Sequence, residues 1–213
     1  MTNTEQPEKL EITCNENGPY IIKNVSEMIS TKGKPMATKD TMALCRCGQS
    51  SLKPFCDGTH SQVGFSGEIN SNRSKDRKDS YAGERITIHD NRGLCAHAGV
   101  CTKNLSSVFR MKQSPWIDAD QAPVDEVKTV IDQCPSGALS YSVEGEEPVA
   151  ASSQTIITVI PNGPYKIVGN VEIHSVDAFD GASNNTRTLC RCGHSKNKPF
   201  CDGSHWDAGF EDA

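Results

Sequence analysis

The stretch CRCGQSSLKPFCDGTHSQVGF, residues 45–65, occurs a second time in the chain, as CRCGHSKNKPFCDGSHWDAGF at residues 190–210. The three cysteines, His60 and Phe65 of the first stretch each have a counterpart of the same type 145 residues later. The upstream sequence Asn-Gly-Pro-Tyr, at 17–20 and 162–165, has the same offset. The repeated unit therefore extends beyond the cysteine motif, and the sequence predicts two copies of one small module.

Each copy begins with a short run of apolar and β-branched residues, at 10–14 and 155–160, which predicts a strand. A second strand is expected after the Asn-Gly-Pro corner, at 20–25 and 165–173, because glycine and proline interrupt regular pairing at the corner. The cysteine segment is rich in glycine and proline, so we expect an irregular loop closed by a short helical turn. The predicted fold class is α+β and mostly β.

The composition indicates that metal sites hold these modules together. Only 35% of the 213 residues are hydrophobic and 6% are aromatic, which is lean for one large core. The chain has ten cysteines but no secretory signal at its first residues, so we expect a cytoplasmic protein, in which disulfides are disfavoured. Nine of the cysteines fall into three groups of three: Cys45, Cys47, Cys56; Cys95, Cys101, Cys134; and Cys190, Cys192, Cys201.

The remaining cysteine, Cys14, corresponds to Val159 in the other copy. Valine cannot bind a metal, so we expect Cys14 to be a small buried hydrophobic residue.

The charge and hydropathy patterns exclude two classes of partner. Twenty-two basic against 27 acidic residues give a net charge of −5, whereas nucleic-acid-binding domains normally present a basic face. No apolar run approaches the roughly 18 residues of a membrane span. We therefore expect neither nucleic acid nor membrane as a partner.

The repeated motif places three sulfurs and one imidazole together. Cys45 and Cys47 lie on one side of an extended loop, and Cys56 and His60 share a face if a helical turn follows. Asp57 is placed to cap that turn or to hydrogen-bond a ligand. Three cysteines and a histidine suit zinc, although the C-x-C spacing is unusual for zinc. From spacing alone, zinc and an iron–sulfur cluster remain equally open.

The pattern C-x-C-x2-S-x3-P-x-C-D-G-[ST]-H resembles the signature of the CDGSH iron–sulfur family, to which mitoNEET belongs. Both copies match it throughout, with Thr59 in place of the serine. The resemblance implies two [2Fe–2S] clusters, and a tandem pair implies an internal pseudo-dimer and so a monomer. The implied ligands are Cys45, Cys47, Cys56 and His60, and Cys190, Cys192, Cys201 and His205; Ser50, Asp57, Ser195 and Asp202 are the matched residues around them.

Imidazole as a ligand has two consequences. Replacing a thiolate by a neutral imidazole removes one negative charge, so reduction becomes easier than in an all-cysteine cluster. A protonated histidine cannot bind iron, so acid is expected to release the cluster.

The middle of the chain resembles neither copy. Cys95-x2-Ala98-x2-Cys101 keeps the outer cysteines of a ferredoxin C-x2-C-x2-C motif, and an amphipathic helix over 124–134 ends at Cys134-Pro135. The segment resembles the divergent single-cluster ferredoxin domain, which implies a small ferredoxin-like α+β domain. With alanine at the central position, the cluster is either [3Fe–4S] on Cys95, Cys101 and Cys134, or [4Fe–4S] with His97 as the fourth ligand.

The expected domains are a first CDGSH module at 8–68, a ferredoxin-like domain at 81–146 and a second CDGSH module at 154–213. Polar, charged stretches at 71–80 and 145–154 are expected to be the linkers between them.

Three iron–sulfur centres in a small acidic chain indicate electron transfer. The sequence has no Gly-rich phosphate loop and no nucleophile elbow, so we do not expect an enzyme. The main hypothesis is a one-electron carrier that meets a redox partner protein through a small polar surface. The alternatives are a cluster storage or transfer protein that serves an apo-acceptor protein, and a redox or iron sensor.

Overall fold

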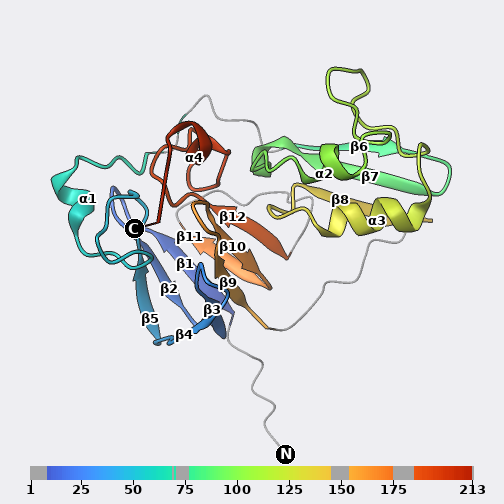
Figure 1. Cartoon of the computed structure of the whole chain (residues 1–213). Helices are drawn as coiled ribbons and strands as arrows, with labels where there is room; N and C mark the ends of the chain where they lie inside the picture. The colour runs from blue at the N-terminus through green and yellow to red at the C-terminus, as the bar shows by residue number, and fades with distance from the viewer. Residues whose placement is uncertain (1–8, 69, 71–76, 145–153, 175–184, 213) are drawn as a thin grey trace, which may run out of the picture.

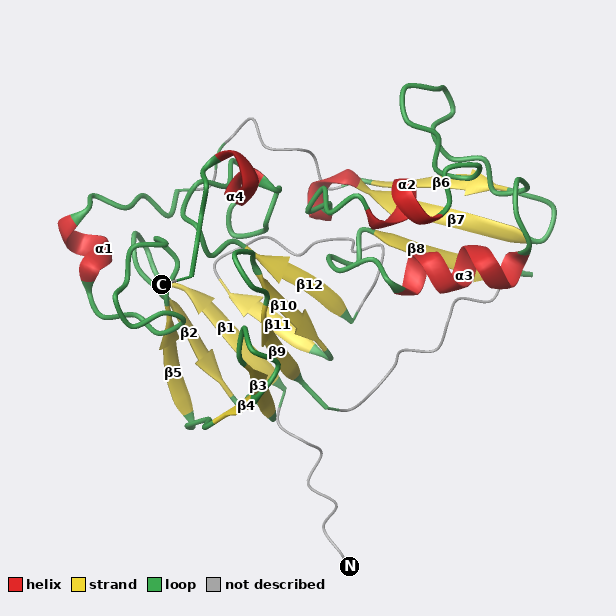
Figure 2. Ribbon diagram, viewed as in Figure 1, coloured by secondary structure: helices red, strands yellow, loops and turns green. Residues whose placement is uncertain are grey.

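The computed structural model of the chain describes residues 9–68, 70, 77–144, 154–174 and 185–212. Two β-sheets built from the repeats lie side by side, and a smaller domain with its own sheet and two helices lies next to them (Figures 1 and 2). The described part of the chain is mostly β with short helices, which confirms the predicted fold class.

The two copies contain matching elements. The first copy comprises β1 (Leu10–Cys14), β2 (Tyr20–Lys23), β3 (Glu27–Ile29), β4 (Pro35–Met36), β5 (Thr41–Leu44) and α1 (Thr59–Gln62). The second comprises β9 (Ile156–Val159), β10 (Tyr165–Val168), β11 (Val171–His174), β12 (Thr186–Leu189) and α4 (Ser204–Asp207). The first strand of each copy therefore forms where the β-branched run predicts it.

The copies exchange strands. One sheet has the order β11-β1-β2-β5 and the other β12-β10-β9-β3-β4. In each sheet the exchanged strand is parallel to the first strand of the other copy: β11 pairs with β1, and β3 pairs with β9. Neither sheet can form from one copy alone, so the two modules fold as one intertwined pseudo-dimer.

The exchange explains where the strand predictions are wrong. Residues 165–173 do not form one strand, because Gly169 at φ 112° turns the chain between β10 and β11. The equivalent break at Asn24, also at positive φ, ends β2 before residue 25 and sends β3 to the other sheet.

One apolar core lies between the two sheets and takes residues from both copies. Cys14 is buried in it, 9% exposed, as is its counterpart Val159, which confirms that Cys14 is a core residue. The other fully buried members include Leu10, Ile12, Tyr20, Ile22, Met28, Ile157, Tyr165 and Ile167.

The middle domain has a separate core. Its sheet has the order β6-β7-β8, formed by Lys78–Ala82, Ile86–Asn91 and Leu139–Val143, and it is covered by α3 (Val124–Asp132). A 3-10 turn (Arg92–Leu94) ends directly before Cys95, and α2 (Val100–Asn104) contains Cys101. The predicted helix is confirmed, and Val127, Val130 and Ile131 form its buried face.

The linker predictions have mixed outcomes. Strand β6 begins at Lys78, inside the segment 71–80 for which a linker was expected. Paired backbone hydrogen bonds with β7 hold this polar strand although it has few apolar residues. Residues 71–76 and 145–153 lie outside the described residues.

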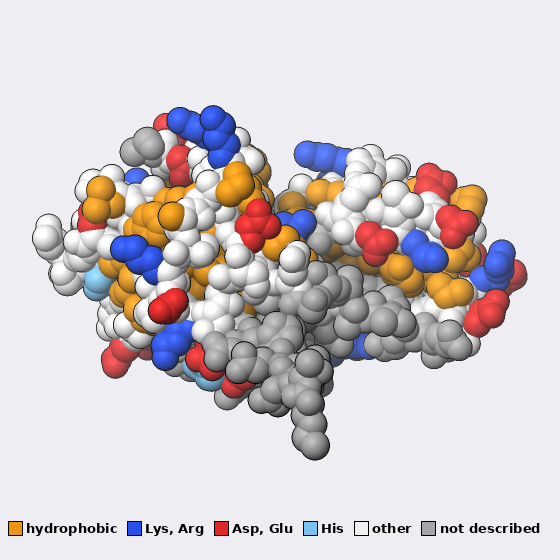
Figure 3. Space-filling model, turned by 90° about the horizontal axis from the view of Figure 1, so that it is seen from below, with side chains coloured by type: hydrophobic (Ala, Val, Ile, Leu, Met, Phe, Trp, Pro, Cys, Tyr) orange, Lys and Arg blue, Asp and Glu red, His pale blue; other side chains and the backbone are white. Residues whose placement is uncertain are grey.

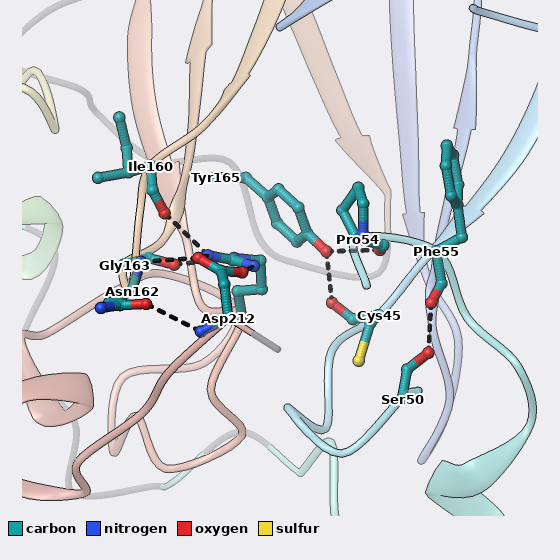
Figure 4. A network of polar contacts seen from close by, with 10 residues as sticks. Cys45, Ser50, Pro54, Phe55, Ile160, Asn162, Gly163, Tyr165 and Asp212 are labelled. Atoms are coloured by element: carbon teal, nitrogen blue, oxygen red, sulfur yellow. Dashed lines mark hydrogen bonds and ion pairs between the residues drawn. The ribbon is translucent and has the colours of Figure 1, made fainter. Parts of the chain in front are cut away.

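Two tyrosines connect the copies reciprocally. The Tyr20 hydroxyl lies 2.9 Å from the carbonyl oxygen of Cys190 and 3.0 Å from that of Pro199. The Tyr165 hydroxyl makes the matching contacts with Cys45 and Pro54, both at 2.9 Å (Figure 4). Each core tyrosine therefore supports the cysteine loop of the other copy.

The cysteine loops, residues 45–56 and 190–201, also touch each other directly. A Cβ on Gly48 would lie 2.6 Å from the carbonyl oxygen of Cys192, and one on Gly193 would lie 2.6 Å from that of Cys47. Both glycines have positive φ, 78° and 83°. Only glycine fits here, because any side chain would push the two loops apart.

We expect Gly48→Ala to destabilise the protein by about 3 kcal/mol or more, because it combines a left-handed backbone strain of about 1–2 kcal/mol with a backbone clash. Chemical denaturation followed by circular dichroism checks this. Gly64→Ala is the matched control, since Gly64 also has positive φ, 63°, but has no atom within 4 Å of an added Cβ. Equal losses in the two variants would show that the loop contact is unimportant.

Candidate metal centres

The two C-x-C pairs are held close together and buried. The Sγ atoms of Cys45 and Cys47 are 3.8 Å apart, and those of Cys190 and Cys192 are 3.7 Å apart. The backbone amides of Gln49 and His194 point to the second sulfur of each pair, at 3.5 and 3.4 Å. N–H donors of this kind stabilise negative charge on a thiolate.

The second pair in each copy comes from the turn after the cysteine loop. Cys56 Sγ lies 3.3 Å from Nδ1 of His60, and Cys201 Sγ lies 3.5 Å from Nδ1 of His205. The helical turn places each histidine one turn after its cysteine, as the sequence predicted. All eight predicted ligands are thus placed in four matching pairs.

The donors of each CDGSH copy are grouped in two pairs, a C-x-C pair and a cysteine–histidine pair. Three thiols and one imidazole are soft donors of the kind that bind iron–sulfur clusters or zinc.

Ser50, Asp57, Ser195 and Asp202 hold the loops rather than contact the sulfurs. The Ser50 hydroxyl donates to the Phe55 carbonyl at 2.6 Å (Figure 4), and Ser195 does the same to Phe200 at 2.7 Å.

The aspartates tie the loop to the helical turn. Asp57 accepts from the amides of Thr59 and Ser51 at 3.0 and 2.8 Å, and these hydrogen bonds lower the pKa of its carboxyl. Asp202 accepts from the backbone amides of Ser204 and Lys196 at 3.0 and 2.8 Å. The N-cap residue of α1 is Gly58, which has no side-chain cap, so Asp57 is not the cap that was predicted; it accepts from the first amide of the helix instead.

Burial makes the two copies unequal. His205 and Cys201 are 6% and 3% exposed, whereas His60 and Cys56 are only partly buried. Burial raises the pKa of Cys201 to about 12. Without metal this thiol is therefore protonated at neutral pH, and metal insertion must release its proton.

Each C-x-C pair has a buried arginine between its two cysteines in the sequence, Arg46 in the first copy and Arg191 in the second. Neither arginine was predicted to matter. Arg191 is 1% exposed, and its guanidinium donates to the carbonyls of Gly163 and Ile160 and forms an ion pair with Asp212. Arg46 is 3% exposed. An arginine retained between the cysteines of both copies is the sequence signal that could have revealed them.

The three middle cysteines line one pocket. Cys95, Cys101, Cys134 and His97 all border it, together with Arg92 and Ser136. Burial, followed by the neighbouring Cys134 and Cys95, raises the pKa of Cys101 to about 11. The soft thiolate donors that these residues supply fit an iron–sulfur cluster.

The middle pocket lies against the second copy. His97 Nδ1 is 3.1 Å from the carbonyl oxygen of Asp202, and the Asn197 side chain donates to the Gly93 carbonyl at 2.6 Å. An added Cβ on Gly203 would meet the carbonyl oxygen of Ala96 at 3.1 Å. Asp202 and Gly203, which follow Cys201, therefore pack against Ala96 and His97, which follow Cys95.

The molecular surface shows charges of both signs. In Figure 3, acidic and basic side chains are scattered over the face that is drawn, with no large area of one sign. Within the described residues, no helix has the length and hydropathy needed to cross a bilayer.

Comparison with known families matches this architecture. A family described as "Iron-binding zinc finger CDGSH type" matches residues 17–61 and 162–206, and one described as "Divergent 4Fe-4S mono-cluster" matches 81–144. The protein YjdI from Escherichia coli strain K12, described as uncharacterized, is 44% identical over 61 residues, 29% of this chain and 80% of YjdI; YjdI from strain O157:H7 matches equally. The chain is therefore an iron–sulfur protein of the CDGSH family, with two CDGSH modules on either side of a divergent 4Fe–4S mono-cluster domain.

Proposed function

We propose that the protein is a one-electron carrier with a [2Fe–2S] cluster in each CDGSH copy and a [4Fe–4S] cluster in the middle domain. The observation that carries the proposal is the contact between the middle pocket and the second copy, through His97 and Asp202 at 3.1 Å. Contact between two cluster sites shortens the distance an electron must cross between them, which serves a carrier and has no use in a storage protein.

When bound, such clusters supply reversible uptake of a single electron. The chain's own residues hold the sites rigidly, because the tyrosines and the loop glycines lock the two CDGSH loops against each other. Amide donors to Cys47 and Cys192 stabilise the extra negative charge that reduction brings. A rigid, hydrogen-bonded site changes little between its two redox states, so little reorganisation opposes transfer.

The middle cluster would be held by Cys95, Cys101 and Cys134. His97 is the candidate fourth ligand. It borders the same pocket, and the Asp202 carbonyl contacts only its Nδ1, which leaves Nε2 free in the described structure. The family description as a 4Fe–4S mono-cluster domain favours the four-iron cluster.

Cluster transfer to an apo-acceptor protein is the second candidate. The partly buried position of His60 favours it, because solvent can reach a ligand that is lost on protonation. We further propose a cytoplasmic monomer that meets one redox partner protein.

Low-temperature EPR with iron, sulfide and zinc analysis tests the main proposal. On anaerobically purified protein we expect about eight irons per chain, no EPR signal in the oxidised state and signals after dithionite. Repeated reduction and oxidation should leave the iron content unchanged. Zinc in place of iron, or steady iron loss to an added apo-ferredoxin during cycling, would contradict the carrier function.

His97→Ala tests the fourth ligand. If Nε2 binds iron, the variant should lose one iron, giving about seven per chain, and show a near-isotropic [3Fe–4S] signal before reduction. His194→Ala is the matched control, because His194 is an exposed loop histidine of the second copy. An unchanged iron count in His97→Ala would remove His97 from the ligand set.

Acid is expected to release iron from the first copy before the second. Burial lowers the pKa of His205, and Arg191 adds to this against the opposing Asp202, so protonating His205 requires a lower pH. His60 is more accessible to solvent. The measurement is the visible absorbance of two variants from about pH 8 to about pH 5: His60→Cys, which keeps His205 as a ligand, and His205→Cys, which keeps His60. Equal pH midpoints of absorbance loss in the two variants would contradict the expectation. So would unchanged acid loss in the variant that carries both substitutions.

A further inference from the structure

The two copies present the same surface differently to the rest of the chain. Gly203 of the second copy lies against Ala96, while its counterpart Gly58 has no atom within 4 Å of an added Cβ. Asn197 is 5% exposed and bonded to Gly93, while its counterpart Leu52 is 63% exposed. The middle domain therefore covers this face on the second copy and leaves it open on the first.

The open face lies on the far side of the molecule. In Figure 1, α1 projects away from the middle domain, whereas α4 lies above the sheets on the side nearer that domain. Val63, directly after α1, is 50% exposed and adds a second apolar side chain to the segment. We call the segment Leu52–Val63 the open CDGSH face.

A second, independent difference concerns charge. The amide of Gly67 donates to Asn17 Oδ1 at 2.9 Å, and the amide of Asp212 donates to Asn162 Oδ1 at 2.8 Å, so the two backbone positions are equivalent. The Asp212 carboxylate pairs with Arg191. Gly67 has no side chain that could form an ion pair with Arg46.

Arg46 is consequently a buried cation without a carboxylate partner among the described residues. Its two terminal nitrogens donate to the carbonyls of Asn15 and Gly67, both at 3.0 Å, and its Nε has no partner there. Its guanidinium stacks over the Tyr20 and Phe65 rings instead. The arginine between the C-x-C cysteines of the first copy thus lacks the carboxylate pair that its counterpart has in the second, and Glu16 and Glu68 border the same pocket without pairing with it.

Both differences act in the same direction. An uncompensated cation stabilises the more negative, reduced state of a nearby cluster, and so does solvent at a partly exposed site. The second site is buried, its arginine is neutralised, and the thiolates of the middle pocket lie next to it. An electron shared between the two CDGSH sites is therefore more stable at the first.

We infer that the first CDGSH site is the outer end of the internal path, where an electron settles and is exchanged with an external ferredoxin-like protein that docks on the open CDGSH face. The inference rests on the proposed carrier function. The choice of partner follows from the repeat, since the equivalent face of the second copy receives a ferredoxin-like domain of the same chain. In each exchange one electron moves and no bond or proton is transferred.

Redox titration monitored by EPR tests the charge difference. In His205→Cys the unaltered first site is measured, and in His60→Cys the unaltered second site is measured. We expect the first site to hold the electron about tenfold more strongly, which is about 59 mV for one electron. Gly67→Asp should lower the potential of the first site, and Asp212→Asn should raise that of the second.

Equal potentials in the two backgrounds, or no response of the first site to Gly67→Asp, would overturn the inference while leaving the carrier function intact. If the clusters cannot be cycled at all, the carrier function itself fails. In Gly67→Asp the Arg46 guanidinium must shift, because an added Cβ would lie 2.6 Å from its Nη1. Gly67→Asn requires the same shift without adding a charge and is the matched control.

Stopped-flow kinetics test the docking face, with a reduced bacterial ferredoxin as the probe and the oxidised full chain as acceptor. Leu52→Glu should lower the second-order rate constant by roughly tenfold, because one charge on a docking surface acts mainly on association. Met111→Glu is the matched control, since Met111 is an equally exposed apolar residue, 67%, in the middle domain. Equal rates in the two variants, or no reaction with the unaltered chain, would overturn the open CDGSH face as the docking site.

Discussion

The strand exchange between the two copies is the constraint on which the remaining structure depends. Because β11 pairs with β1 and β3 pairs with β9, neither sheet is complete without both ends of the chain. The shared core then fixes Tyr20 and Tyr165, whose hydroxyls reach across to the cysteine loop of the opposite copy. Each metal site is thus supported from the other module, and the two sites are held at a fixed separation.

The same constraint allows the two copies to differ without losing the fold. The backbone contact at Asn17 and at Asn162 is the same, so Gly67 and Asp212 occupy matching positions with opposite consequences for the nearby arginine. A homodimer of one module would have two identical sites. Joining the copies in one chain lets one site become buried and covered while the other stays open. The two sites can then have different roles in electron transfer.

The sequence predicted the features that local chemistry determines. The ligand pairs, the first strands, the middle helix and the burial of Cys14 all follow from spacing, residue type and the repeat itself. The exchange of strands could not be predicted, because β-branched runs specify a strand but not its partner. The break at Gly169 and the start of β6 at Lys78 were missed for a related reason: backbone turns and edge pairing decide them, and apolar pattern does not.

The residues that make the copies unequal were missed although each was visible. Arg46 and Arg191 are equivalent in the repeat, so their different partners appear only in the structure, where Arg46 donates to the Asn15 carbonyl and Arg191 to the Asp212 carboxylate. Asn197 and Leu52 differ in the alignment of the copies, but a single polar-for-apolar change in a loop has no meaning until Gly93 is seen opposite it. In a tandem protein, the positions that are identical in the two copies therefore indicate the metal ligands. The positions that differ indicate how the two sites differ in burial, charge and access to a partner.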